Sequence, residues 1–153
     1  MNEPKKIWHY TIGIHLPKII ESKLIKLATI GVREKPAVWF STNPIWEQTC
    51  NKLWRDSITG KLRQLSKEET HRYGNGLVRI RVKPEAAPYN FQAFKRISKI
   101  SNNAAKRLTE KAELWGAKPQ GWWVSFEPVP QSEWLDVEVW DGMNWNSMLE
   151  IEK

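Results

Sequence analysis

The sequence predicts a single domain of the α+β class, with a mixed β-sheet core and flanking helices. A chain of 153 residues has the usual size of one domain, so we expect residues 1–153 to fold as a unit. Strand-like and helix-like segments follow one another in the order β-α-β-α-loop-β-α-β-β. That order lacks the regular alternation that builds a doubly wound parallel sheet, which is why we expect the α+β class.

The first third of the chain predicts two strands, each followed by a helix. Residues 7–16 are rich in β-branched and aromatic side chains, which is typical of a strand. Residues 17–30 begin with a proline, place apolar side chains at helical spacing and end before Gly31, a common helix stop. Residues 37–42 predict a second strand. Residues 43–54 predict a helix, because they open with an asparagine that can cap it and a proline that suits its first position.

The remainder of the chain predicts a polar loop, one long helix and several short strands. Residues 55–76 are polar and interrupted by glycines, so we expect a loop or flap. Residues 76–82 alternate in polarity like a half-exposed strand, and 91–115 carry one apolar stripe at helical spacing. Two further strands are expected at 121–130 and 134–140, followed by a turn and a last short strand.

The composition combines a formal net charge of +7 with ten tryptophans. A positive field favours polyanionic partners, although it says nothing about the fold. Tryptophans often pack in cores, but they are also enriched at interfaces and binding sites. Cys50 is the only cysteine, so no internal disulfide can form. The sequence shows no signal-like segment and no long apolar run, and we expect a cytoplasmic protein without a membrane span.

The familiar sequence signatures of enzyme chemistry are absent. The chain contains neither a GxGxxG nor a GxxxxGK[ST] phosphate loop, and no GxSxG nucleophile turn. Its three histidines and Cys50 match no metal-ligand spacing, so we expect no metal site. A His-x-Thr element occurs once, whereas the two-histidine phosphodiesterases need two copies.

Three short polar groups remain at the ends of predicted strands. They are residues 9–11 (His-Tyr-Thr), 39–42 (Trp-Phe-Ser-Thr) and 131–133 (Gln-Ser-Glu), the last of which opens the strand that contains Glu138. Each group also has an ordinary structural interpretation. A histidine can be a hydrogen-bonded core residue, Ser and Thr are common helix caps, and strand glutamates are usually solvated.

The order and spacing of these groups resemble the ADP-ribosyltransferase superfamily, in particular the small DarT-like enzymes that modify DNA bases. In that superfamily an early strand carries a His or Arg that holds the nicotinamide ribose of NAD. A second strand ends in an aromatic-Ser-Thr element, and a late strand opens with a Glu. The resemblance covers about the first third of the chain and the segment around 122–140. It implies that NAD is a substrate, bound by His9, Tyr10, Thr11, Trp39, Phe40, Ser41 and Thr42.

The resemblance also implies a catalytic carboxylate, for which Glu133 and Glu138 are the candidates and Glu127 stays open as a third. Cleavage of the bond between nicotinamide and ribose passes through an oxocarbenium-like transition state, which a nearby carboxylate stabilises electrostatically. The same carboxylate can orient or deprotonate the acceptor.

The acceptor of the ADP-ribose stays open between a nucleic acid and a protein. The positive net charge suits a nucleic acid, whose phosphates would be contacted by Arg79, Arg81, Lys95 and Lys99. Two other functions also stay open. One is a non-catalytic module of the same fold that binds nucleic acid or a partner protein through a basic, Trp-rich surface. The other is an NAD glycohydrolase, in which water is the acceptor.

Overall fold

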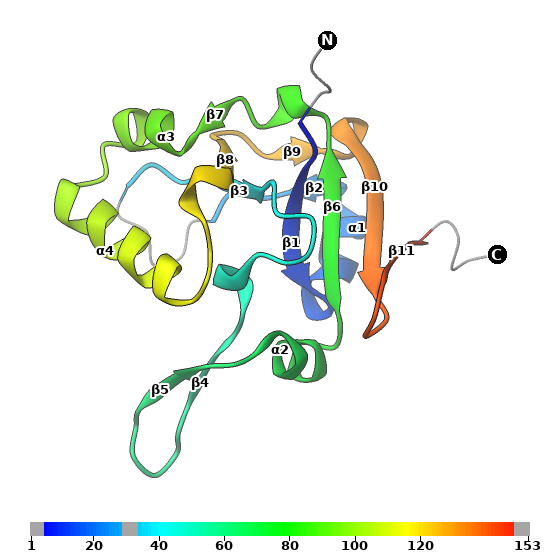
Figure 1. Cartoon of the computed structure of the whole chain (residues 1–153). Helices are drawn as coiled ribbons and strands as arrows, with labels where there is room; N and C mark the ends of the chain where they lie inside the picture. The colour runs from blue at the N-terminus through cyan, green and yellow to red at the C-terminus, as the bar shows by residue number, and fades with distance from the viewer. Residues whose placement is uncertain (1–4, 29–33, 149–153) are drawn as a thin grey trace.

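A computed structural model describes residues 5–28 and 34–148, which fold around a seven-stranded sheet (Figure 1). The strand order is β11-β10-β6-β1-β3-β8-β7, and each of its ladders is antiparallel. The α+β class is therefore confirmed, and the sheet is antiparallel where we expected a mixed one. Its strands are β1 (Ile7–Ile12), β3 (Val38–Ser41), β6 (Leu77–Val82), β7 (Tyr89–Asn90), β8 (Trp122–Ser125), β10 (Trp134–Trp140) and β11 (Trp145–Ser147).

In the described ranges, four α-helices and two small two-stranded sheets lie around this sheet. The helices are α1 (Leu16–Ser22), α2 (Lys67–Tyr73), α3 (Phe91–Ser98) and α4 (Asn102–Leu114); the small sheets pair β2 (Leu24–Ile25) with β9 (Val129–Pro130), and β4 (Leu53–Arg55) with β5 (Leu62–Gln64). Figure 1 shows α3 and α4 on the side of β7 and β8, with α2 and the β4–β5 hairpin at the opposite end of the view from α3. None of the described helices is long and apolar enough to cross a membrane.

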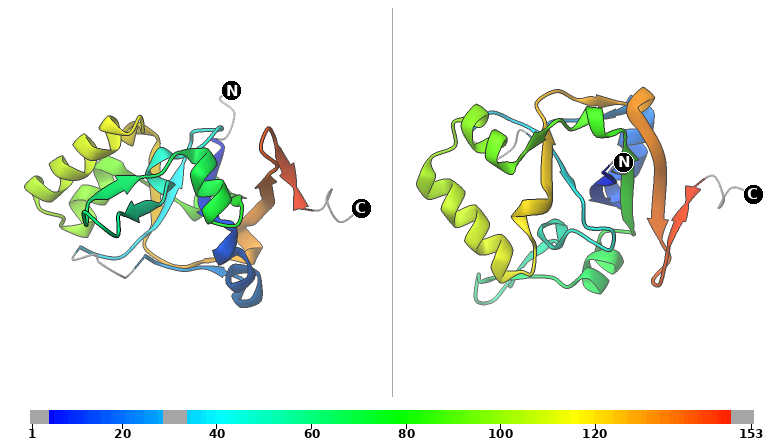
Figure 2. Two further views of the ribbon diagram at one scale, coloured as in Figure 1. Left: turned by 90° about the horizontal axis from the view of Figure 1, so that it is seen from below. Right: turned by 45° about the horizontal axis from the view of Figure 1, so that its top comes forward.

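The large sheet consists of two halves that meet at a narrow junction. β1 pairs with β6 over its whole length, from Ile7 to Ile12, but with β3 only through the pair Trp8 and Ser41. The two views of Figure 2 show β3 and β8 turning away from the half formed by β1, β6, β10 and β11. Strands that separate beyond a short ladder leave space between them, and a small cavity lies at this junction.

Alternation along β1 supplies side chains to two separate apolar clusters. Trp8, Tyr10 and Ile12 pack on one face of the sheet, with the fully buried Trp46 over them. Ile7 packs on the other face, which it shares with the half-buried side chains of His9 and Thr11. A third cluster lies under α3 and α4. The strand predicted at 7–16 is therefore confirmed, with its end at Ile12.

The helix predicted at 43–54 is wrong. Asn43 does cap a local turn, since its Oδ1 accepts a hydrogen bond of 2.9 Å from Ile45 N, but no helix continues from it. The only helical turn here is a 3-10 turn at Gln48–Cys50. Burial of Trp46, whose Nε1 donates to Asn51 Oδ1 at 2.9 Å, fixes the segment as a packed loop instead.

The other two predicted helices are shorter than the sequence pattern indicates. α1 ends at Ser22 and α3 at Ser98, because Lys23 and Lys99 adopt left-handed backbone angles, with φ of 58° and 61°. After the first break, β2 pairs with β9; after the second, Ser101 caps the separate helix α4. Gly31, the expected stop of the first helix, lies outside the described residues.

The segment predicted as a loop at 55–76 contains regular structure. It forms most of the β4–β5 hairpin and the helix α2, which begins with a capping box between Ser66 and Glu69. The next strand, β6, is buried along nearly its whole length instead of half-exposed, because it lies between β1 and β10. The expected strand at 121–130 divides into β8 and β9, while those at 134–140 and near the end of the chain are confirmed.

Candidate functional site

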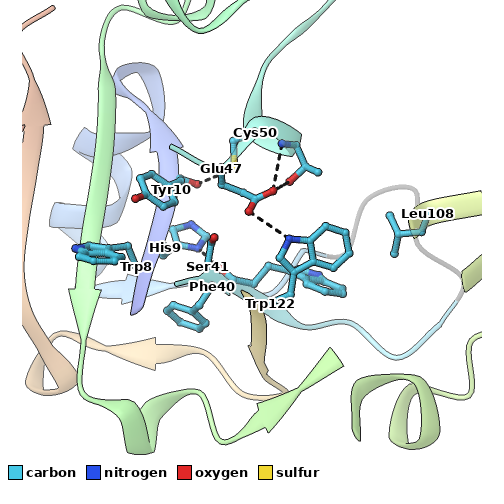
Figure 3. Close-up of a pocket in the computed structure, with 11 residues that line it drawn as sticks. Trp8, His9, Tyr10, Phe40, Ser41, Glu47, Cys50, Leu108 and Trp122 are labelled. Atoms are coloured by element: carbon cyan, nitrogen blue, oxygen red, sulfur yellow. Dashed lines mark hydrogen bonds between the residues drawn. The ribbon is translucent and has the colours of Figure 1, made fainter. Parts of the chain in front are cut away.

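A mostly apolar cavity of about 170 Å³ opens at the junction of β1 and β3 (Figure 3). Four segments supply its walls: β1, β3 with the loop after it, α4 through Leu108, and the start of β8. Its lining residues are Trp8, His9, Tyr10, Trp39, Phe40, Ser41, Glu47, Thr49, Cys50, Leu108 and Trp122. Of the seven residues predicted to bind NAD, five therefore lie here, while Thr11 and Thr42 do not.

His9 is held against the neighbouring strand by its own side chain. Its Nδ1 lies 2.9 Å from the carbonyl oxygen of Trp39, and its ring contacts Phe40 edge-on at 5.8 Å between centroids. A carbonyl can only accept, so Nδ1 carries the proton of this hydrogen bond. Burial lowers the pKa of His9 below its ordinary value of 6.5, and the nearby His15 lowers it further. His9 is therefore neutral near pH 7, with Nε2 left as an acceptor.

Glu47 supplies a carboxylate that the sequence analysis missed. It is buried, and all its hydrogen bonds come from neutral donors: Thr49 Oγ1 at 2.7 Å, Thr49 N at 3.3 Å and Trp122 Nε1 at 3.2 Å. In the described part of the chain no salt bridge joins it to a cation. Figure 3 shows the carboxylate between Trp122 and the 3-10 turn that contains Cys50. The one sequence signal for it is a Glu-x-Thr pair after the predicted strand at 37–42.

The aromatic walls of the cavity are fixed by contacts behind them. Trp39 meets Trp122 edge-on at 5.8 Å and Phe94 at 4.5 Å between ring centroids. Tyr10 donates its phenol proton to the carbonyl of Asn43, and burial raises its pKa to about 12. Rings locked in this way offer a flat ligand a preformed surface. Ser41 is also buried, and its Oγ accepts a hydrogen bond of 3.1 Å from Asn43 N.

Cys50 lines the cavity but is not activated. Its Sγ lies 3.5 Å from the carbonyl oxygen of Tyr10, and burial raises its pKa well above the ordinary value of 9.0. A thiol in this state is a poor nucleophile, because thiolate is the reactive form. We therefore assign Cys50 a packing role. It lies at the margin of the cavity, whereas the sequence predicted that it belongs to a helix at 43–54.

Glu138, one of the two predicted catalytic residues, lies outside the cavity and forms an ion pair with Arg79. Two bonds of 3.1 Å join the guanidinium to the carboxylate, and the side chains are only 10% and 15% exposed. Arg79 also lies between the rings of Trp8 and Trp145, at 4.7 and 4.6 Å from their centroids. Tyr10, Arg79 and Glu138 are register neighbours on β1, β6 and β10, which is why they form one row.

The other predicted site residues lie in different places. Glu133 and Glu127 line a separate cavity of about 660 Å³ with Lys35. Thr11 lines a third cavity of about 450 Å³, to which His9 also belongs. Thr42 lies next to Gly121, whose carbonyl accepts a hydrogen bond of 3.0 Å from Thr42 N.

The four residues predicted to contact nucleic acid do not form one surface. Arg79 is buried in its ion pair, and Arg81 is half-buried on the same strand, β6. Lys95 lies over the ring of Phe91 on α3, and Lys99 is exposed just after that helix. Figure 1 places β6 and α3 in different halves of the fold.

The described residues include no group of three or more His, Cys, Asp or Glu side chains that could hold a metal ion. Comparisons with protein-family models, with curated proteins and with solved structures found no match for this chain. The geometry of the cavity is therefore the guide to the function of this chain.

Proposed function

We propose that this chain is an NAD-dependent ADP-ribosyltransferase whose cavity between β1 and β3 holds the nicotinamide ribose of NAD. The observation that supports this most strongly is the meeting of three unlike groups in one aromatic cavity. His9 contributes a neutral acceptor, Ser41 a buried hydroxyl, and Glu47 a carboxylate held only by neutral donors.

The size of the cavity limits which part of the dinucleotide it can enclose. Pockets that enclose a whole drug-sized ligand measure roughly 300–1,000 Å³, whereas this one measures about 170 Å³. It therefore suits one flat ring and the atoms next to it. We assign it to nicotinamide, with Trp39 and Tyr10 as walls, and place the rest of NAD outside.

The polar groups suit the ribose attached to that ring. His9 Nε2 can accept a hydrogen bond from a ribose hydroxyl, and the Ser41 hydroxyl, whose oxygen accepts from Asn43 N, can donate one. Both groups are fixed by bonds to the backbone. A site whose groups are already oriented loses little entropy when the ligand binds.

The chemistry follows from the position of the carboxylate. The bond between C1′ and the nicotinamide nitrogen breaks, and its electron pair leaves with neutral nicotinamide. The positive charge that develops on the ribose is stabilised by Glu47, because no cation already neutralises that carboxylate. The acceptor then forms a bond to C1′ and gives up its proton to Glu47, which acts as the general base.

In this proposal Glu47 takes the role that the resemblance suggested for Glu133 or Glu138. Glu138 acts one layer behind the cavity, since its partner Arg79 donates a hydrogen bond of 3.3 Å to the Tyr10 hydroxyl and lies against Trp8. It is a positioning residue. Glu133 lines a different cavity and has no role in the proposal.

The test combines NAD binding with nicotinamide release. We expect saturating NAD to raise the melting temperature of the wild type by about 5 °C or more, as ligand at a hundred times its Kd stabilises by ~2.7 kcal/mol. His9→Ala should abolish the shift. Glu47→Gln should retain binding but release nicotinamide at least ~100-fold more slowly. Glu133→Gln is the matched control, and should behave as the wild type in both assays.

No thermal shift at millimolar NAD would overturn the proposal. Equal loss of turnover in Glu133→Gln and Glu47→Gln would overturn the assignment of the carboxylate. Release of free ADP-ribose in the absence of any other acceptor would identify water as the acceptor and make the chain a glycohydrolase.

A further inference from the structure

The α1 cavity, of about 450 Å³, lies where α1 and β2 cover part of β1. The left-handed turn at Lys23 ends α1 after seven residues, and β2 then pairs with β9 instead of joining the large sheet. Figure 1 shows α1 and β2 behind that sheet. The space that remains beside β1 has the size of pockets that enclose a small molecule, roughly 300–1,000 Å³.

Hydrogen bonds fix the corner between α1 and β2 that bounds this cavity. Ser22 Oγ lies 3.3 and 3.4 Å from the carbonyl oxygens of Ile19 and Leu24, and it accepts a bond of 3.3 Å from Leu24 N. Next to the β2–β9 ladder, Gln131 N donates a bond of 3.0 Å to the carbonyl of Lys23. The cavity is thus formed before any ligand binds, which lowers the entropic cost of binding.

Apolar side chains form one wall of the α1 cavity. Ile25 is fully buried in the core cluster that contains Ile7 and Ile80, and the partly buried Ile19 and Leu27 pack against the same cluster. Ile19, Ile25 and Leu27 all line the cavity. A wall that is continuous with the core suits the hydrocarbon part of a ligand, because that part leaves water when it binds there.

The ionisable side chains that line the α1 cavity are all basic: they are His9, His15, Lys18 and Lys26. None of its described lining residues is Asp or Glu. Lys18 and Lys26 are exposed, and neither takes part in a salt bridge within the described ranges. Ammonium groups beside an apolar wall fit a ligand that joins a negative head to a hydrocarbon body.

We propose that the α1 cavity binds a small amphipathic anion, a hydrocarbon chain that ends in a carboxylate or a phosphate. The chain lies on Ile19, Ile25 and Leu27, and the negative head contacts the ammonium groups of Lys18 and Lys26. The charge of the walls favours an anion over an amine with the same chain, since no lining carboxylate could pair with an ammonium group.

His9 separates the α1 cavity from the cavity between β1 and β3. Its side chain lines both of them, and its Nδ1 is held by the carbonyl of Trp39 at 2.9 Å. The two cavities share no other lining residue, so each can hold its own ligand. The inference does not require NAD, and a binding assay for the anion succeeds or fails independently of the proposed transferase activity.

The experiment is isothermal titration calorimetry of the full chain with octanoate, octyl phosphate and octylammonium, which share one chain and differ in their heads. We expect octanoate or octyl phosphate to bind in the millimolar range or more tightly, and the tighter of the two identifies the head. Octylammonium should bind at least about tenfold more weakly than that anion. Hexanoate, which lacks two methylenes, should bind up to about fifteenfold more weakly than octanoate.

A charge-matched pair of double variants separates the cavity from the general charge of the protein. Lys18→Met with Lys26→Met removes two cations that line the cavity, whereas Lys106→Met with Lys111→Met removes two from α4. We expect only the first pair to weaken binding of the anion, at least about fivefold. All four lysines are exposed, so both proteins should fold, and their melting temperatures establish this.

Three results would each overturn the proposal. They are the absence of binding by either anion at tens of millimolar, equal weakening by the two double variants, and binding of octylammonium as tight as that of the anions. Competitive displacement of the anion by NAD would overturn it as well, because the anion would then occupy part of a dinucleotide site. A chain that binds the anion but not NAD would refute the proposed transferase function and leave this inference intact.

Discussion

Two carboxylates lie near Tyr10, the buried Glu47 and the largely buried Glu138, and they are bonded by opposite kinds of partner. Glu138 is bonded twice by the guanidinium of Arg79. Glu47 is bonded by a hydroxyl, a backbone amide and an indole, all of them neutral. The charge of the first carboxylate is matched by a cation, so it stabilises the fold and holds Arg79 against Tyr10 and Trp8. The second has no cationic partner among the described residues and lines a cavity, where it can stabilise positive charge that develops on a ligand.

The strongest test of this comparison is to remove Arg79, the cation that pairs with Glu138. Arg79→Ala leaves Glu138 buried without its partner, and breaking such a pair costs about 3–5 kcal/mol of unfolding free energy. Glu47→Gln, which keeps the size of the side chain and leaves no cation unpaired, should cost much less. Urea denaturation measures both.

A paired replacement serves as the control for Arg79→Ala. Arg79→Met combined with Glu138→Leu removes both charges together and should recover most of the lost stability, because apolar replacement of a whole buried pair is often neutral. A cost below about 1 kcal/mol for Arg79→Ala would mean that the pair is screened by solvent. The contrast between the two carboxylates would then fail.

A smaller effect is expected from weakening the donors around Glu47. Thr49→Val keeps the shape of the side chain but removes the hydroxyl that donates to Glu47 Oε2 at 2.7 Å. Since a hydrogen bond to a charged group contributes about 1.5–3 kcal/mol and Thr49 is half-buried, we expect a loss of about 1.5 kcal/mol. Thr109→Val on α4 is the matched control, and should change the unfolding free energy by less than ~0.5 kcal/mol. Equal losses of unfolding free energy in the two variants would show that the hydrogen bond from Thr49 to Glu47 stabilises the fold no more than an ordinary one.

Local sequence patterns predicted the strands better than the helices, for physical reasons. The strands β1, β3, β6 and β10 are apolar, β-branched and aromatic, and packing on the sheet agrees with that preference. The helix expected at 43–54 follows local capping signals, but burial of Trp46 outweighs them. The left-handed angles of Lys23 and Lys99 have no local signal, because the residue at such a helix end is usually Gly or Asn.

Part of the site was predicted from the sequence, because some of its residues lie on strands that were predicted well. His9 and Ser41 lie at strand ends, and the junction of β1 and β3 brings them to one cavity. Glu47 was missed because the segment that contains it was interpreted as a helix. The capping box of Ser66 and Glu69 was visible in the sequence, and would have located α2 inside the supposed loop.

The smallest expected effect concerns His9, a titratable group that lines the cavity between β1 and β3. Burial holds its pKa in the folded state below 6.5, so the unfolded chain binds its proton first as the pH falls. Stability is therefore complete above about pH 6.5 and declines below it, by at most ~1.36 kcal/mol per pH unit for one proton. The decline stops once the pH falls below the pKa of His9 in the folded state.

Unfolding free energies of the wild type and of His9→Gln between pH 7.5 and 5 isolate this contribution, because the other acidic and basic groups are common to both. The difference between the two proteins should shrink as the pH falls; a constant difference would mean that His9 titrates alike in the folded and unfolded chain, and that the cavity does not hold it neutral.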